Sequence, residues 1–493
     1  MNKTYNNTIQ LSELIYLAYF TVMFGARAIG LYEGMLAYNM MLVAGMLLFL
    51  LKIAMTRHTF GEYLLIGVLL FISLIVYYNT GEKGLLLYFT MMLGMKGVSV
   101  RRVLKMGTII LSISFVTLVL LSVTGIKEDI IYIHDRAGFG KIIRHSLGYP
   151  YPNTLFTTYI VLMVLIVYMM GVQNKKDLLL TSLFLLIGAL YIYLYSCSNT
   201  GIIVAVFYLI INLYLQFRPH LSIVEKAGIM LVYPLCDLIA ILGPLVTTGK
   251  MFQVFDKILH NRWAYSLYYL TNEPITMFGT RFKEPPNTNY MIDSSFLYSF
   301  LQIGVVPFII LTIFYMVMIY NYVKNERKVE LAIIISFCLL GMSDPFLFNL
   351  SYKNLLFLFI GEVFYDKLQS KKKFKLEMLN REIQILPIGN KVLDISNSMY
   401  QYYNQRLEHI RRFFIANRFK VCFTYLIFVV VVVCTLFRVS WSEYITERVD
   451  QINEWEYVRG ILSIGIWGSL LIVAVIIILG KILGKGKKHK MLS

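Results

Sequence analysis

Apolar runs long enough to cross a lipid bilayer recur along almost the whole chain. At about 1.5 Å of rise per residue, a helix of about 17 to 25 apolar residues covers the roughly 30 Å hydrocarbon layer of a membrane. The first run begins at Leu11, and others follow almost to the C-terminus. Lipid offers the backbone no hydrogen-bond partner, so each run is expected to be an α-helix. This feature predicts an all-α, multi-pass membrane protein.

The composition agrees with this prediction. Of the 493 residues, 58% are hydrophobic and only 15% are charged, and the mean hydropathy is +0.66. No class of soluble domain has this balance. The formal net charge of +18 would indicate a nucleic-acid partner in a soluble protein, but in a membrane protein the position of each charge matters more than the sum.

We expect fourteen membrane spans, twelve in a core and two near the C-terminus. They cover residues 11–31, 35–51, 62–79, 84–95, 106–125, 153–172, 178–195, 200–216, 226–246, 294–321, 329–343, 352–366, 420–438 and 460–480. The fourth of these runs is short enough to be re-entrant or tilted.

Lysine and arginine give the orientation, because cytoplasmic loops carry an excess of both. Every second loop of the predicted bundle is rich in them, as are residues 371–375 and the tail at 485–490. Both chain ends are therefore expected in the cytoplasm.

Two long segments on the opposite, outer side break this pattern. Residues 126–152 and 247–293 also contain many cations. Long loops are translocated in spite of their charge, so the violation is tolerated. An anionic ligand at the outer surface would explain it.

The chain changes character after residue 366. Residues 1–366 form the expected core, 367–419 a polar cytoplasmic linker, and 420–493 a C-terminal two-helix module. Within the linker, residues 400–412 interleave aromatic residues with arginine. This pattern fits either a helix lying on anionic inner-leaflet lipid or an ordinary solvated helix.

The first outer segment carries candidate anion ligands. Arg136, Lys141 and Arg144 lie within ten residues of one another, just before His145. Arginine suits phosphate because its planar guanidinium group donates two parallel, charge-assisted hydrogen bonds. The alternative is a solvated loop, or a loop that anchors to lipid head groups.

The second outer segment combines cations with a carboxylate. His260, Arg262, Arg281 and Lys283 precede Asp293, which lies at the mouth of a predicted span. A base that takes a proton from an attacking hydroxyl group needs such a carboxylate, poised near neutrality by burial and neighbouring charges. An aspartate just before a helix is also a common N-cap, and this alternative stays open.

Four single positions carry weaker signals. Ser198 lies in a tight outer turn, where it either caps a helix or contacts a ligand. Asp344 lies at an outward-facing helix break and is a candidate second acidic residue. Snorkelling to the membrane surface explains Arg27, and Asp237 within a span indicates either a function or pairing inside the bundle.

Several common site motifs are absent from the sequence. It has no Walker A loop, no HExxH, no GxGxxG after a strand, and no metal-ligand spacing among its five cysteines. ATP hydrolysis and zinc chemistry are therefore not expected, and neither is a cofactor.

Three pieces of the sequence carry a family resemblance. They are Arg144 to Gly148 with Pro152 and Asn153, then Tyr195 to Gly201, and then Asn261 to Trp263, Phe278, Gly279, Ile292, Asp293 and Gly304. In order, spacing and common outward side they resemble the O-antigen polymerase and ligase superfamily, specifically the Wzy-type polymerases of Gram-positive capsular and exopolysaccharide clusters. The resemblance covers about residues 10–366. Asn199 stands where many members have arginine, and Asp293-Ser294 stands where ligases have His-Asn, which favours a polymerase.

The resemblance implies an activity and its partners. It implies a GT-C-like membrane bundle that polymerises undecaprenyl-pyrophosphate-linked oligosaccharide repeat units into a surface polysaccharide. Glycosyl transfer would occur at the outer face of the plasma membrane, without a metal or cofactor. The implied partners are the lipid-linked oligosaccharides, the bilayer, a chain-length regulator and a flippase, but no nucleic acid.

Under this hypothesis the candidate residues take specific roles. Asp293 or His145 is the base, and Arg262 is the third catalytic residue. Arg262, Arg144 and Arg281 bind pyrophosphate. The other substrate-binding candidates are Arg136, His260, Lys283, Asp344 and Ser198.

Two other functions stay open. A lipid-linked oligosaccharide flippase commonly has fourteen spans with both ends inside, but its cations would line a central cavity rather than two long outer loops. A ligase, or another transferase that uses a lipid-linked glycan, shares the chemistry of a polymerase and is not distinguished by sequence.

Overall fold

The computed structural model describes residues 8–136, 140–172, 174–259, 261–283, 285, 291–370, 377–394, 412, 416–417, 419–438 and 454–489. They pack as two units. We call residues 9–130 and 145–393 the helical core, and the second unit comprises the described residues of 1–8, 131–144 and 394–493. The helix expected over residues 400–412 falls, apart from Arg412, outside the described residues.

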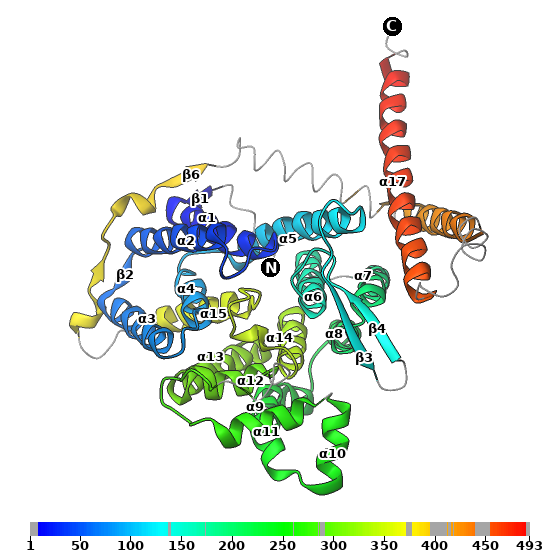
Figure 1. Ribbon diagram of the computed structural model, residues 1–493. Coiled ribbons are helices and arrows are strands. Elements are labelled where there is room, and N and C mark those ends of the chain that lie inside the picture. The colour runs from blue at the N-terminus through cyan, green and yellow to red at the C-terminus, as the bar shows by residue number, and fades with distance from the viewer. Residues whose placement is uncertain are drawn as a thin grey trace. The chain divides into compact units, whose positions relative to one another are not determined.

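The helical core is built from α-helices (Figure 1). They are α1 (Leu11–Ala28), α2 (Leu36–Met55), α3 (Phe60–Thr80), α4 (Gly84–Leu93), α5 (Val100–Val123), α6 (Pro152–Met170), α7 (Lys175–Ser196), α8 (Asn199–Phe217), α9 (Ile223–Val246), α10 (Gly249–Ile258), α11 (Arg262–Asn272), α12 (Ser295–Tyr298), α13 (Val305–Lys324), α14 (Lys328–Gly341) and α15 (Leu356–Ser370). Short strands accompany them: β1 (Thr8–Gln10), β2 (His58–Thr59), β5 (Glu382–Ile383) and β6 (Val392–Asp394). The all-α prediction missed these strands.

Ten helices of the described residues are long and apolar enough to cross a membrane. In the core they are α2, α3, α5, α6, α7, α8, α9 and α13, and in the second unit they are Phe419–Arg438 and Val458–Val475. The other four expected spans correspond to α1, α4, α14 and α15. Three of these helices are short, with 10, 14 and 15 residues in α4, α14 and α15. The multi-pass helical bundle is confirmed, but the expected count of fourteen is not reached on this criterion.

The short helices are buried inside the core. α4 extends for only about 15 Å at 1.5 Å per residue, half of the hydrocarbon layer. Its residues from Gly84 to Leu93 are nearly all buried, and α14 packs against α6, α8, α9 and α13 (Figure 1). Protein therefore surrounds their ends, and irregular backbone is tolerated at membrane depth where protein covers it.

The chain between α14 and α15, residues 342–355, is the largest of these irregular segments. Side chains donate hydrogen bonds to the carbonyl groups of its backbone. The hydroxyl group of Tyr88 donates to the carbonyl oxygen of Phe346 over 2.9 Å, and Nδ2 of Asn354 donates to the carbonyl oxygen of Leu347 over 2.8 Å. These bonds let the chain leave the helical conformation without exposing polar groups to an apolar surrounding.

A second break divides the span expected over residues 294–321. The chain forms α12 and a π-helical turn over Ser299–Ile303, and α13 begins only at Val305. Gly304 between them has φ 104° and ψ 164°, a conformation open essentially to glycine alone. The expected single helix is therefore wrong at its start, because hydropathy does not register one backbone angle.

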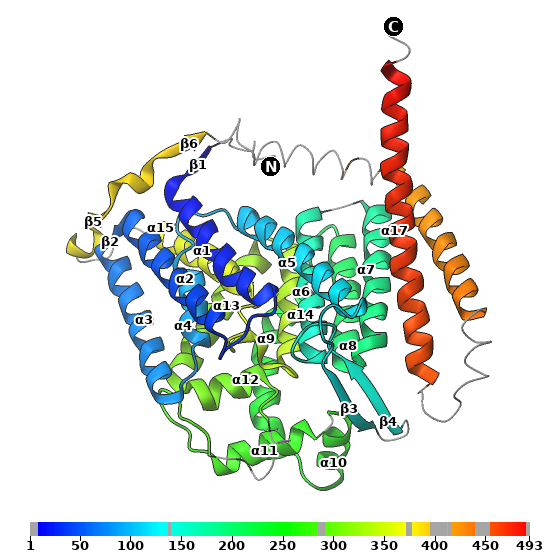
Figure 2. The same cartoon turned by 45° about the horizontal axis from the view of Figure 1, so that its top comes forward.

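Loops gather at two opposite ends of the core. Figure 2 shows α10 and α11 at one end and β2 with β5 at the other. We call the first the loop end; it holds the described residues of 29–35, 81–83, 124–130, 145–151, 197–198, 247–304 and 342–355. The basic end holds 56–59, 94–99, 218–222, 325–327 and 377–393. Charged contacts join loops within each set: Lys83 pairs with Glu33 at the loop end, and Nδ1 of His220 lies 3.3 Å from Oε2 of Glu326 at the basic end.

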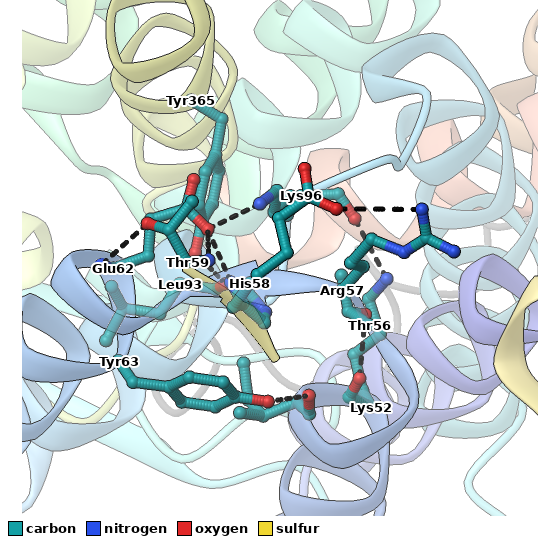
Figure 3. A network of polar contacts seen from close by, with 12 residues as sticks. Lys52, Thr56, Arg57, His58, Thr59, Glu62, Tyr63, Leu93, Lys96 and Tyr365 are labelled. Carbon is teal, nitrogen blue, oxygen red and sulfur yellow. Dashed lines mark hydrogen bonds and ion pairs between the residues drawn. The ribbon is translucent and has the colours of Figure 1, made fainter. Parts of the chain in front are cut away.

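A buried ion network stabilises the basic end (Figure 3). Oε2 of Glu62 accepts from Nδ1 of His58 at 3.1 Å, from the backbone N–H of Thr59 at 3.1 Å, and from Nζ of Lys96. Nζ of the buried Lys52 donates to the carbonyl oxygen of Lys96 over 2.9 Å. One carboxylate therefore ties the start of α3 to the end of α4 and, through Lys96, to α2.

Residues 377–393 of the expected linker pack against this end. β5 pairs antiparallel with β2, so that His58 faces Ile383. Backbone N–H groups of Leu386 and Leu11 donate to the carbonyl oxygens of Ala54 and Lys391, each over 2.9 Å. This stretch belongs to the core and is not a free connection.

The second unit contains a hairpin and two helices. β3 (Ile131–Arg136) pairs with β4 (Gly140–His145), which the sequence did not predict. The helix Phe419–Arg438 contacts α17 (Glu454–His489), where a Cβ on Gly465 would lie 2.2 Å from Cγ2 of Val433. In the same unit the buried Arg459 donates from both terminal nitrogens to the carbonyl oxygen of Ile143 at 3.3 Å.

The Glu62 network predicts a stability effect. Glu62→Gln should lower the free energy of unfolding by about 3–5 kcal/mol, because it breaks a largely buried ion pair and leaves Lys96 without its counter-charge. The measurement is thermal unfolding in detergent. The control is Glu382→Gln, which removes an exposed partner of Arg57 and should change stability little. Equal shifts in the two variants would contradict the network's role.

Candidate functional site

Two of the predicted site residues meet directly at the loop end. Nε of Arg262, the first residue of α11, donates to Oδ2 of Asp293 over 2.7 Å. Both side chains keep some contact with solvent, at 19% and 33% exposure. Thirty-one positions separate them, so this contact follows from the fold and not from neighbouring sequence.

The N-cap alternative for Asp293 does not hold. The residue that caps α12 is Ser294, whose Oγ accepts from the backbone N–H of Leu297. Asp293 precedes the cap and directs its carboxylate at Arg262 instead. The guanidinium group uses one of its five N–H donors in this bond, so the pair retains hydrogen-bonding capacity toward an anion.

Asp344 lies close enough to Asp293 for their charges to interact. Its Oδ2 accepts from Oγ1 of Thr157 over 2.9 Å and its Oδ1 from the backbone N–H of Phe346 over 3.0 Å. Burial raises the pKa of Asp344, the negative charge of Asp293 raises it further, and the positive charge of Lys353 lowers it. The structure thus brings the two predicted acidic residues into one electrostatic site.

Lys353 is a buried cation in the same site. Its Nζ donates to Oγ1 of Thr158 over 2.5 Å, and it is 6% exposed. The positive charge of Arg27 and the negative charge of Asp344 both act on it. Consecutive residues of α6, Thr157 and Thr158, therefore hold the acidic and the basic group of the 342–355 segment.

Ser198 also meets a residue of α6. Its Oγ donates to Oδ1 of Asn153 over 3.1 Å, and the preceding Cys197 has φ 46°, which turns the chain between α7 and α8. Two separate pieces of the sequence resemblance therefore touch. Within the described residues this contact makes Ser198 part of the packing between α6 and α8.

His145 is positioned by a carboxylate that the sequence analysis did not single out. Its Nδ1 lies 2.5 Å from Oδ2 of Asp129, and its ring meets that of Tyr195 edge to face at 5.7 Å. The backbone N–H groups of Ser146 and Leu147 donate to Oδ1 of the same carboxylate at 3.1 and 2.7 Å. Asp129 therefore fixes the start of the chain that leads into α6.

The remaining predicted residues make no contact with the Arg262–Asp293 pair that the structure describes. The guanidinium group of Arg281 packs over the turn at Gly81, where a Cβ would lie 3.6 Å from its NH2. Lys283 is exposed, and its backbone N–H donates to Glu273 over 3.0 Å. Arg136 and Arg144 lie on strands of the second unit, and His260 falls outside the described residues.

A cavity of about 350 Å³ opens between these loops. Its lining comes from α1, the α3–α4 turn, α11, the approach to α12, and the 342–355 segment. The lining residues are Arg27, Glu82, Tyr269, Phe282, Met291, Ile292, Tyr298, Gln302, Pro345, Asn349, Leu350 and Ser351. The wall is mainly apolar with a few polar groups, as in sites that bind small organic ligands.

Sequence analysis missed some of these residues or explained them otherwise. Arg27 was assigned to snorkelling, but it lines the cavity, and its NH1 donates to the carbonyl oxygen of Leu31 over 3.1 Å. Glu82 and Lys353 were not considered. Their charge could have identified them. A charged residue in a very short connection between apolar helices costs free energy unless it has a partner or a function.

Comparison with known proteins gives no match to a protein-family model, a curated protein or a solved structure. Among the residues that the structure describes, no group of three or more His, Cys, Asp or Glu side chains is placed to hold a metal ion. What the fold and the apolar helices define is the class: the chain is a multi-pass helical membrane protein. The polymerase resemblance stays a prediction.

The break at Gly304 predicts a packing effect. Gly304→Ala should cost at least about 1–3 kcal/mol, because φ is positive and the new Cβ would lie 2.3 Å from the backbone nitrogen of Gly279. Thermal unfolding in detergent measures it. Gly67→Ala is the matched control, since nothing lies within 4 Å of that position in α3. A Gly304 variant as stable as the control would show that the loops do not meet as described.

The site also predicts an effect of pH. Lys353→Met should raise the pKa of Asp344, because it removes a positive charge that favours the carboxylate. Reaction of protonated Asp344 with dicyclohexylcarbodiimide should then persist to higher pH. Mass spectrometry measures it, with Asp344→Asn to identify the signal and Lys250→Met as control. An unchanged midpoint would contradict the coupling.

Proposed function

We propose that this protein is a glycosyltransferase that polymerises undecaprenyl-pyrophosphate-linked oligosaccharide repeat units into a surface polysaccharide. The loop end is then the outer, extracellular face of the plasma membrane. The reaction uses neither a metal nor a cofactor. The further partners are a flippase that supplies the lipid-linked units and a regulator of chain length.

The observation that carries the proposal is the Arg262–Asp293 pair beside a cavity with apolar walls. Asp293 is bonded to Arg262 at 2.7 Å, and its neighbours Met291 and Ile292 line the cavity. A lipid-linked pyrophosphate has an anionic head and an apolar tail. A cation at the edge of an apolar cavity at one end of a membrane bundle fits both parts of such a molecule.

The proposed reaction needs only two kinds of group from the protein. The oxygen of the acceptor hydroxyl group forms a bond to the anomeric carbon of the donor sugar, and the bond from that carbon to the pyrophosphate oxygen breaks. The electron pair leaves with the pyrophosphate. The hydroxyl proton passes to a base. The protein must therefore stabilise charge on the leaving group and orient one base.

The candidate residues supply these two needs. Arg262 and Arg281 bind the pyrophosphate and stabilise its added charge as the bond breaks. Arg144, on a strand of the second unit, is the further candidate cation from the sequence. Asp293 or His145 takes the proton. Asp344, whose pKa is raised by burial, is the second acidic group of the site, and Arg136, His260, Lys283 and Ser198 are the remaining candidate substrate contacts.

Other activities remain as competitors. A flippase for lipid-linked oligosaccharides would bind the same head group but form no bond, and a ligase would transfer the glycan to another acceptor. Asp293-Ser294, where ligases carry His-Asn, favours the polymerase over the ligase.

Reconstitution tests the proposal. The purified protein in liposomes, supplied with lipid-linked oligosaccharide isolated from the producing cells, should form a ladder of products on a gel. Arg262→Ala should reduce ladder formation by at least about 10²–10³-fold, the usual effect of removing one group that stabilises transition-state charge. Lys250→Ala, an exposed cation on α10, should leave it unchanged.

Each alternative outcome has a clear meaning. Exchange of the lipid between leaflets without new glycosidic bonds would replace the polymerase by a transporter. Full activity of Arg262→Ala, with normal insertion in the membrane, would remove this arginine from the site.

A further inference from the structure

The cavity at the loop end contains a carboxylate that the proposed reaction does not use. Glu82 follows Gly81, whose φ of 80° turns the chain out of α3. Nε2 of Gln302 donates to Oε1 of Glu82 over 3.0 Å. Both residues line the cavity. Gln302, in the π-helical turn before α13, therefore holds the carboxylate in place.

A buried hydroxyl group lies beside this carboxylate. Tyr298, on α12, is 6% exposed and also lines the cavity. Its hydroxyl oxygen is buried and lies close enough to the Glu82 carboxylate to act on its charge. The carboxylate and the phenol therefore form one polar pair in the wall of the cavity.

The surroundings of Glu82 favour the protonated form of its carboxyl group. Burial raises its pKa, and the negative charge of Glu33 raises it as well. Arg27 also lines the cavity; its Nε donates to the carbonyl oxygen of Ser351 over 3.4 Å, and its guanidinium group lies over the ring of Tyr38 at 5.1 Å. The lining of the cavity therefore includes hydrogen-bond donors and acceptors.

Aromatic and aliphatic side chains form the rest of the wall. The rings of Tyr269 and Phe282 meet at 5.2 Å between centroids, and Ile292 and Leu350 add apolar surface. A sugar ring has hydroxyl groups at its rim and C–H groups on its faces. Carboxylate, amide and phenol groups match the rim, and aromatic rings match the faces. The volume of about 350 Å³ is at the small end of ligand sites.

We propose that this cavity is a binding subsite for one sugar ring of the lipid-linked oligosaccharide, in which Glu82, Gln302 and Tyr298 hold the ring hydroxyl groups. The inference rests on the proposed function for the identity of the ligand. It assigns Glu82 and Tyr298 to substrate recognition. Bond formation stays with the Arg262 and Asp293 region.

Kinetics and binding together test the subsite. In the reconstituted reaction, Glu82→Gln and Tyr298→Phe should each raise KM for the lipid-linked oligosaccharide by about tenfold or more, with kcat within about twofold, because loss of ground-state contacts acts mainly on KM. Glu128→Gln, an exposed acid of the same end, is the control.

Binding is measured separately by hydrogen–deuterium exchange of residues 291–303, with the water-soluble oligosaccharide released from the lipid as the probe. The wild type should be protected, and Glu82→Gln should need at least about ten times more probe. If the wild type polymerises, but both variants show the KM and the protection of the wild type, the subsite is wrong and the proposed function stands. Protection without polymerisation would support the subsite and refute the polymerase. Neither binding nor polymerisation would refute both.

Discussion

The loop end depends on one constraint, which is that a chain leaving the helical conformation inside a membrane protein must find a partner for each exposed backbone group. The 342–355 segment meets it with side chains from several helices. Asn354 donates to the carbonyl oxygen of Leu347, and Oγ of Ser295 donates to that of Asp344 over 2.6 Å. These bonds hold α12, α14 and α15 together. They also hold Asp344 and Lys353 in the interior, where burial raises the pKa of Asp344. Other residues of the same segment line the cavity, namely Pro345, Asn349, Leu350 and Ser351.

Sequence reasoning predicted the long spans well and the interruptions poorly. An apolar run shows that a segment prefers lipid or protein to water, so α2, α3 and α5 to α9 were recognised. The same run does not show whether a helix is broken by one residue. Gly304 reads as an ordinary glycine until the backbone of Gly279 is seen 2.3 Å from its Cβ position. The pairing of β2 with β5 was equally hidden, because its register is set by tertiary packing at the basic end.

The candidate site was partly accessible to the same reasoning. Arg262, Asp293 and Asp344 were selected as cations and acids near helix ends on one side, and the fold brings these three into one electrostatic site. Glu82 and Lys353 were missed, because a single charge in a short connection resembles a residue that anchors to the membrane surface. Asp129 was missed because its role appears only with its contact to His145. Sequence therefore finds the chemistry that is locally clustered, and the fold reveals the partners that complete it.

A polymerase of the proposed kind binds its lipid-linked substrate at the loop end. A photoreactive undecaprenyl-pyrophosphate-linked oligosaccharide, cross-linked to the protein in membranes and mapped by mass spectrometry, measures this directly. The account predicts adducts within residues 81–83, 262–283, 291–304 and 342–355. Adducts at the basic end, within residues 52–62 or 94–99, or spread along the lipid-facing helices, would contradict it.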